Sequence, residues 1–137
     1  MVACLVGVTG LLGLPIFFAS WASSVALMLT AWESSAAAPH RIGLCHVAAA
    51  LIGLVAHAAL PTSAWSIGAS VAVAACVVLL IDLMHPPAMA NAAFAFVGMA
   101  TPLDFILTAA IGGLLLGLFA LASSQIRLGW KIGAQPQ

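Results

Sequence analysis

Long apolar runs, separated by short breaks that contain proline or charged residues, make up most of the chain. Runs of this length are typical of membrane-spanning helices, which need about 20 residues each. The breaks divide the sequence into predicted helices over 15–31, 43–60, 64–84, 86–100 and 102–124. Residues 1–14 are expected to form a further, short helix that ends in a tight turn at Leu14-Pro15. The pattern predicts an all-α fold, a polytopic helical transmembrane bundle with about four to five membrane segments.

The breaks also predict how the chain is organised. Residues 32–42 form the first polar loop, and residues 1–124 are expected to be a single transmembrane helical domain followed by a polar C-terminal tail over 125–137. Thr62 and Ser63 can cap the helix over 64–84. Thr101 and Asp104 have the spacing of a capping box, with Asp in the position usually taken by Glu or Gln.

Small residues at a spacing of four predict close contacts between helices. Gly113 and Gly117 form a GxxxG pattern, and Ala49 with Gly53 gives a second small pair. Such pairs allow two helix backbones to approach closely in a membrane. We expect them to serve mainly intramolecular packing, with an oligomer contact as the alternative.

His85-Pro86-Pro87 is the strongest local signal, because it interrupts an apolar run that extends from 71 to 96. Proline has no backbone N–H, and the residue before a proline is disfavoured in the α region. One helix should therefore stop near Met84 and the next should start at Pro86. Broken helices at membrane depth occur where they line a cavity or are buried in protein, so the break predicts a functional site.

Composition supports a membrane location. Of the 137 residues, 65% are hydrophobic and 4% are charged, whereas soluble domains carry roughly 25% charged residues. We therefore expect an integral protein of a lipid bilayer, most simply a bacterial inner (plasma) membrane. The formal net charge is zero and there is no polybasic stretch, so nucleic acid is not an expected partner.

Neither a cofactor, a metal site nor an enzymatic activity is predicted. The three cysteines lie in apolar segments without CxxC spacing, which favours small buried hydrophobes: they are Cys4, Cys45 and Cys76. No G-x-S-x-G nucleophile pattern or phosphate-binding loop is present in the sequence. Two alternatives would involve a metal. A metal ion could be transported near His85, or His46 or His57 could bind a haem iron.

The positive charges predict an orientation. Arg41 follows the first polar loop, and Arg127 and Lys131 follow the last span. The positive-inside rule places all three in the cytoplasm. They reach the same side only if 86–100 crosses the membrane, so we expect a crossing there and a cytoplasmic C-terminus.

Ionisable residues at membrane depth are functional candidates by default. Asp82 and His85 are three residues apart, which puts them on one face of a continuous helix and predicts a carboxylate–imidazolium pair. The alternative is that both lie at an interface where water reaches them. His46 and His57 are eleven residues apart, or about 16 Å along one helix face. They could line a pathway, or each could bond to a neighbouring helix, and Asn91 is a further polar candidate.

The break itself predicts a site for a small monovalent anion. A helix that starts at Pro86 would leave the N–H groups of Ala88 and Met89 unpaired and pointing toward the break. The positive end of the helix dipole would point the same way, and a protonated His85 would add charge.

Three sequence blocks resemble the HPP family of small integral membrane proteins. The stretch DLMHPPAMANAAFAF (82–96) resembles the family motif, approximately HPPAGATAL. WASSVALML (21–29) is similar to FGASAVLLF, and SSAAAPHRIGLCH (34–46) resembles SPLAQPRNVIGGH, which places Pro39 and His46 on the family's proline and histidine. The chain departs from the motif at Met89, where the family has Gly, and at Asn91, where it has Thr.

Some members of this family are implicated in nitrite transport, so the resemblance implies a protein that binds or transports a small inorganic anion, with nitrite as the best candidate. The expected binding residues are His85, Pro86, Pro87, Ala88 and Met89, with hydroxyls from Ser23 and Ser24 on a facing helix. His46 and Asp82 would couple protons or orient the site. The rival interpretation is a structural or accessory subunit of a larger membrane complex, and the chain could also form a homo-oligomer.

Overall fold

The computed structural model describes residues 17–97 and 101–133, with side chains described up to residue 126. The described residues form five α-helices and two short 3₁₀ turns. The elements in chain order are α2 (Phe17–Thr30), η1 (Ser35–Ala37), α3 (Pro39–Ala59), α4 (Ala64–Leu80), η2 (Pro86–Met89), α5 (Ala90–Val97) and α6 (Pro102–Gly133). The all-helical prediction is confirmed. The expected first helix over 1–14 and its turn at Leu14-Pro15 lie outside the described residues.

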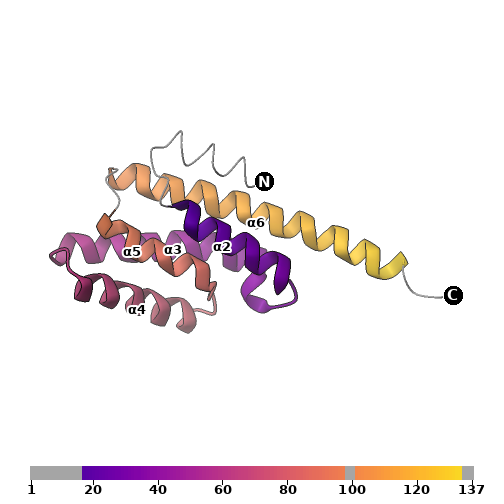
Figure 1. Cartoon of the computed structure of the whole chain (residues 1–137), viewed down its shortest axis with the longest axis horizontal. Coiled ribbons are helices and arrows are strands. Elements are labelled where there is room, and N and C mark those ends of the chain that lie inside the picture. The colour runs from indigo at the N-terminus through magenta and orange to yellow at the C-terminus, as the bar shows by residue number, and fades with distance from the viewer. Residues whose placement is uncertain (1–16, 98–100, 134–137) are drawn as a thin grey trace.

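Helix α3 lies at the centre of the bundle and packs against α4, α5 and α6 (Figure 1). Helix α6 runs antiparallel to α3 along its length, while α2 and α5 cover the sides of this pair (Figure 1). Two core clusters fill the bundle. One lies between α2, α3, α5 and α6, and the other between α3, α4, η2 and α5.

The outer surface of the bundle is apolar. Helices α3 and α6 are long and apolar enough to cross a membrane, and α2 and α4 are shorter apolar helices. Large hydrophobic side chains point outward along them, including Leu80 and Val55, which are 86% and 70% exposed. Trp65 is 89% exposed at the start of α4, where interfacial tryptophans are found. An apolar exterior around a core that contains buried polar groups is what a lipid solvent favours.

Glycines allow α3 and α6 to touch through their backbones. A Cβ atom at Gly113 would lie 2.8 Å from the carbonyl oxygen of Gly43, and one at Gly117 would lie 3.0 Å from that of Pro39. Gly53 approaches α5 in the same way, because its Cβ would lie 2.7 Å from the Ala92 carbonyl oxygen. Both predicted small-residue pairs therefore contribute to packing within one chain.

The contact of Gly117 with Pro39 also places the C-terminal part of α6 beside the start of α3. We call this the Arg41 end of the bundle, and the opposite end, where α3 turns into α4, the Trp65 end. Together, η2 and α5 return the chain from the Arg41 end to the Trp65 end (Figure 1). The segment of α6 that carries Arg127 and Lys131 therefore extends beyond the Arg41 end, as the charge argument requires.

The helix ends partly match the predictions. The Ser63 hydroxyl accepts the N–H of Ser66, and the Thr101 hydroxyl accepts the N–H of Asp104. The predicted cap at Thr101 is therefore present, but the Asp104 carboxylate accepts from the Thr101 hydroxyl, where a full capping box uses the backbone N–H. Helix α3 starts at Pro39 and not at 43, because proline at the first helical position needs no N–H partner. Helix α6 continues to Gly133, so the segment expected to be a polar tail from 125 is helical at first.

Candidate functional site

The break that ends α4 comes earlier than predicted. The helix stops at Leu80, and the N–H groups of Asp82 and Leu83 bond back to the carbonyl oxygens of Leu79 and Val78 at 3.2 and 2.8 Å. This bond pair defines a Schellman motif, which requires a left-handed residue at its turn. Asp82 occupies that position with φ of 54°. The prediction of a continuous helix to Met84 is therefore wrong, because the cap at Asp82 ends the helix several residues before the prolines.

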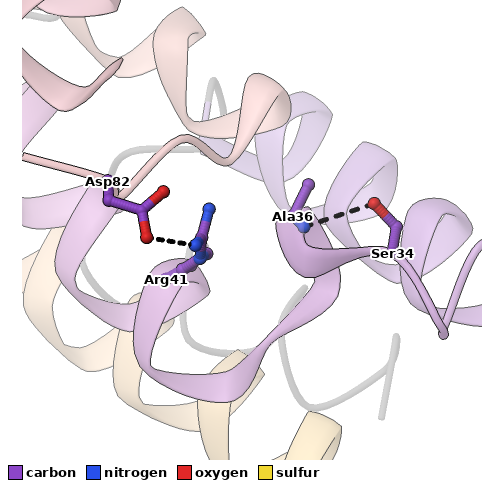
Figure 2. A network of polar contacts seen from close by, with 4 residues as sticks. All are labelled: Ser34, Ala36, Arg41 and Asp82. Atoms are coloured by element: carbon purple, nitrogen blue, oxygen red, sulfur yellow. Dashed lines mark hydrogen bonds and ion pairs between the residues drawn. The ribbon is translucent and has the colours of Figure 1, made fainter. Parts of the chain in front are cut away.

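The early cap separates the two residues that were expected to pair. Asp82 is exposed and forms an ion pair with Arg41, whose Nη2 lies 2.5 Å from its Oδ2 (Figure 2). His85 is fully buried and bonds elsewhere. The predicted Asp82–His85 pair is wrong, since Asp82 ties the break to the start of α3 and takes no part in the interior.

His85 points into the bundle and uses both ring nitrogens. Nδ1 lies 2.7 Å from the carbonyl oxygen of Ala36, in the turn before α3, and Nε2 lies 2.8 Å from Ser24 Oγ on α2. A carbonyl oxygen only accepts, so Nδ1 carries the hydrogen and donates it. In the neutral ring Nε2 is then the acceptor for the Ser24 hydroxyl.

Ser24 joins His85 to a second buried histidine. Its Oγ lies 3.1 Å from Nε2 of His46 on α3, and 2.9 Å from the carbonyl oxygen of Ser20. Ser23, one position earlier, is exposed and donates its hydroxyl to Ala19. Of the two predicted hydroxyls, the structure brings Ser24 to the site and turns Ser23 away, because adjacent helical residues face different directions.

Asn91, at the start of α5, completes the arrangement from the other side of His46. Its side-chain nitrogen lies 3.0 Å from His46 Nδ1 and 3.0 Å from the His46 carbonyl oxygen, so both amide hydrogens have acceptors. Its Oδ1 is buried and has no hydrogen-bond partner in the part of the chain that the structure describes. Buried acceptors are usually paired, so the Asn91 oxygen is an unused polar group in the core.

One consistent orientation of hydrogens runs from Asn91 to Ala36, with the Ser24 hydroxyl turned to His85 and away from the Ser20 carbonyl oxygen. Asn91 donates to His46 Nδ1, His46 donates from Nε2 to Ser24, Ser24 donates to His85 Nε2, and His85 donates from Nδ1 to Ala36. We call these five groups the buried polar chain. Its four side chains belong to residues that are fully buried. The Ala36 carbonyl belongs to η1, just before α3, and so lies near the Arg41 end.

Two further contacts hold the break in place. The Ser20 hydroxyl donates to the Pro87 carbonyl oxygen at 2.7 Å, and the Cys45 thiol lies 3.6 Å from the His85 carbonyl oxygen. The sequence reasoning missed Ser20, although it precedes Ser24 by four residues and so shares its helix face. Cys45 is buried as expected, whereas Cys76 is exposed on the outer face of α4 and Cys4 lies outside the described residues.

Of the two predicted anion-binding amides, that of Ala88 is already hydrogen-bonded. The N–H of Ala88 bonds to the His85 carbonyl oxygen at 3.0 Å, and η2 has only four residues before α5 continues. Ala88 is fully buried and Met89 is 9% exposed. Pro86 is exposed and Pro87 is half-buried against α2. The expectation of an open donor at Ala88 is therefore wrong, while that at Met89 stays a prediction. The polar side chains that the structure brings together lie around His85.

His57 does not share the surroundings of His46. It is exposed near the end of α3, with its ring 5.1 Å from that of Phe96 in an edge-on arrangement. The expectation that both histidines line one pathway is therefore not met in this arrangement. Among the described residues, no group of three His, Cys, Asp or Glu side chains could hold a metal ion.

A cavity of about 280 Å³ opens at the Arg41 end, between the end of α2, the turn at η1 and the C-terminal half of α6. Its polar lining comes from Glu33, Ser34, Ser35, Ser123 and Ser124. Two of the lining residues, Ser35 and Ala37, flank Ala36, whose carbonyl oxygen accepts the hydrogen bond from His85. The outer end of the buried polar chain is thus next to a cavity that is lined by both polar and apolar residues.

The comparisons with known proteins give one family. The family model described as HPP, transmembrane region, matches residues 1–131. No curated protein and no solved structure matches the chain.

Proposed function

Because the chain belongs to the HPP family of integral membrane proteins, we propose that it carries a small monovalent inorganic anion across the bilayer, with nitrite as the first candidate. The observation that supports this proposal is the buried polar chain, which places four hydrogen-bonding side chains inside an otherwise apolar bundle. Ionisable groups within membrane segments are costly, and those that face the interior of a bundle often mark substrate or ion pathways.

The chemistry of the buried polar chain favours an anion that moves with a proton. His46 and His85 are the fully buried described side chains that can become cationic, while Arg41 is engaged with Asp82 at the Arg41 end. Protonation of either histidine would create a positive charge beside the Ser24 hydroxyl. A single buried charge suits a monovalent anion better than phosphate, which would need more positive groups.

The proposal includes a location and an orientation. We place the protein in a bacterial inner membrane, with the Arg41 end and the C-terminus in the cytoplasm, as the positive-inside rule favours. The cavity at the Arg41 end would then be the cytoplasmic vestibule. The proposed activity is transport without chemical conversion, and it requires no cofactor.

Nitrite uptake into liposomes that contain the purified protein tests this function. Uptake is measured at neutral pH, and the rate of protein-free liposomes is subtracted, since nitrous acid crosses bilayers unaided. His46→Gln removes a protonatable group from the core, and His57→Gln is the matched control on the same helix. We expect His46→Gln to lower uptake by about tenfold and His57→Gln to leave it unchanged. Wild-type protein that melts cooperatively but adds no uptake would contradict the proposal.

A second candidate function is a structural or accessory subunit of a larger membrane complex. The observation that favours it is the internal use of both His85 ring nitrogens, together with the paired N–H of Ala88. Mild-detergent purification from native membranes distinguishes the two. A homo-oligomer of defined mass favours the transporter, whereas constant co-purification with other chains in fixed stoichiometry favours the subunit.

A further inference from the structure

We propose that Asn91, His46, Ser24 and His85 form a polarised proton relay, in which the Ser24 hydroxyl is the rotating link between two histidines held in opposite tautomers. The relay would deliver protons from the interior of the bundle to the cavity at the Arg41 end. This inference rests on the proposed function for its role, as the path of the coupling ion. Its geometry can be tested without any anion.

The opposite tautomers follow from the partners at the two ends of the relay. The Ala36 carbonyl oxygen can only accept, so His85 carries its hydrogen on Nδ1. The Asn91 side-chain nitrogen can only donate, so His46 Nδ1 is the acceptor and its hydrogen is on Nε2. The two free Nε2 positions, one with a hydrogen and one without, both face Ser24 Oγ, at 3.1 and 2.8 Å.

Ser24 can switch between two acceptors. Its single hydrogen can point to His85 Nε2 at 2.8 Å or to the Ser20 carbonyl oxygen at 2.9 Å. The first direction suits a neutral His85, which needs a donor at Nε2. The second suits a protonated His85, which donates from Nε2 to the Ser24 oxygen. Rotation about one side-chain bond therefore lets Ser24 serve both protonation states without moving the backbone.

Asn91 can serve both protonation states of His46. As placed, its amide nitrogen donates to the unprotonated Nδ1 of His46, and its buried Oδ1 has no partner among the described residues. If a proton enters at His46 Nδ1, a half-turn of the amide can present Oδ1 as the acceptor for the new N–H. This second state gives up the bond from the amide to the His46 carbonyl oxygen, because an oxygen placed there cannot donate.

Proton transfer along the relay balances as follows. A proton that reaches His46 Nδ1 makes an imidazolium, which passes its Nε2 hydrogen to Ser24 Oγ. Ser24 passes its own hydrogen to His85 Nε2. His85 releases the Nδ1 hydrogen to a water molecule that enters from the cavity beside Ala36, because the Ala36 carbonyl oxygen cannot pass a proton on. One proton enters and one leaves, and both histidines end as neutral rings of reversed tautomer. The start is restored when the contacts of Ser24 open and each ring exchanges its hydrogen with water on its own side, since exchange back through Ser24 would return the proton.

Few other ionisable groups face the relay. From α3, Cys45 lies against the His85 backbone, and the rings of His46 and His85 have centroids 5.6 Å apart. Arg41 and Asp82 neutralise one another at the Arg41 end, and Glu33 lines the cavity there. Among the described residues, α2, α4, α5, η1 and η2 contribute no ionisable side chain to the relay apart from His85 just before η2.

Nitrogen NMR on ¹⁵N-histidine-labelled protein tests the tautomers without a substrate. The chain has four histidines, and a His40→Gln, His57→Gln variant removes the two exposed ones. We expect one remaining ring to be protonated at Nδ1 and the other at Nε2, and single His85→Gln and His46→Gln variants assign them. Two rings of the same tautomer would overturn the relay.

Proton flux into liposomes that contain a pH dye tests conduction, first without nitrite and then with it, against protein-free vesicles. We expect Ser24→Ala to lower protein-dependent acidification by about tenfold, Ser24→Thr to retain it because the hydroxyl is kept, and Ser23→Ala to match wild type. Acidification by Ser24→Ala at the wild-type rate, or by wild type no faster than protein-free vesicles under either condition, overturns the relay. Proton flux that needs Ser24, in a protein that takes up no nitrite, retains the relay and rejects nitrite as the substrate.

Discussion

The indole ring of Trp21 on α2 occupies the space where a side chain of Gly112 on α6 would begin: a Cβ atom there would lie 1.9 Å from the nearest ring carbon. Trp21 is fully buried, so the ring has no open side toward which to move. We expect Gly112→Ala to destabilise the protein by about 1–3 kcal/mol or more, as overpacked cores do.

Gly68→Ala is the matched control, because a Cβ at Gly68 on α4 meets nothing within 4 Å. Alanine is a better helix former than glycine by about 0.5–1 kcal/mol, so this variant should melt at the same temperature or higher. Thermal melting in detergent compares the two. Equal melting temperatures for both variants would show that α2 does not pack on α6 through Trp21.

Ser24→Ala should destabilise the bundle more than Ser23→Ala, although the two serines are neighbours. Removal of the Ser24 hydroxyl leaves Nε2 of both His46 and His85 buried without a partner, which costs about 1–3 kcal/mol. Ser23 is exposed and bonds only to its own helix, so its replacement should stay within about 0.5 kcal/mol. The difference in melting temperature between the two alanine variants is the measurement.

Replacements at Asp82 should separate its backbone role from its charge. A β-branched residue is strained at φ of 54°, so Asp82→Val should cost about 1–2 kcal/mol beyond the lost ion pair. Asp82→Gly relieves the strain and also loses the contact with Arg41, which for an exposed pair is worth about 1 kcal/mol or less. We expect the Gly variant to be close to wild type and the Val variant to melt lower. The opposite order would mean that the charge, and not the left-handed cap, fixes the break.

Cysteine labelling tests the orientation. In a background without the native cysteines, Ser35→Cys at the Arg41 end and Thr62→Cys at the Trp65 end provide two exposed positions. The positive-inside rule predicts that an impermeant thiol reagent added outside intact cells labels Thr62→Cys, and that Ser35→Cys reacts only after lysis. The reverse pattern would place the cavity outside and invert the direction of the proposed proton relay.

The sequence predicts the presence of the elements better than it predicts their ends. The caps at Thr101 and Ser63 are confirmed, because both depend on side chains that bond within one turn of the helix start. The end of α4 is not predicted, since the Schellman motif usually needs glycine and here Asp82 takes the left-handed position. The chain is correctly predicted to be non-helical at His85, before the two prolines. Helix α4, however, ends at Leu80, five residues before this segment.

The candidate site shows the same division. His46, His85 and Ser24 are predicted from the cost of polar groups at membrane depth and from the family resemblance, and the structure brings them together. The choice between Ser23 and Ser24 depends on the rotation of α2 about its own axis, which the apolar surroundings on both faces of that helix leave open. The sequence predicts Asn91 only as a further polar candidate, because its partner, His46, is distant in sequence. The packing of α5 on α3 is what makes the two residues neighbours.

Ser20 and Ser24 together fasten one face of α2 to the segment 85–87, through contacts of 2.7 Å to Pro87 and 2.8 Å to His85. The contact from Ser24 to His46 on α3 is longer, at 3.1 Å. The same segment is also tied to α3, by Cys45 at the His85 carbonyl oxygen and by the pair of Arg41 with Asp82. A motion that slides α2 over α3 would therefore break contacts of Ser24 with the histidines. Displacement of α2 and interruption of the proton path are then a single mechanical event, which couples the two without an additional gate.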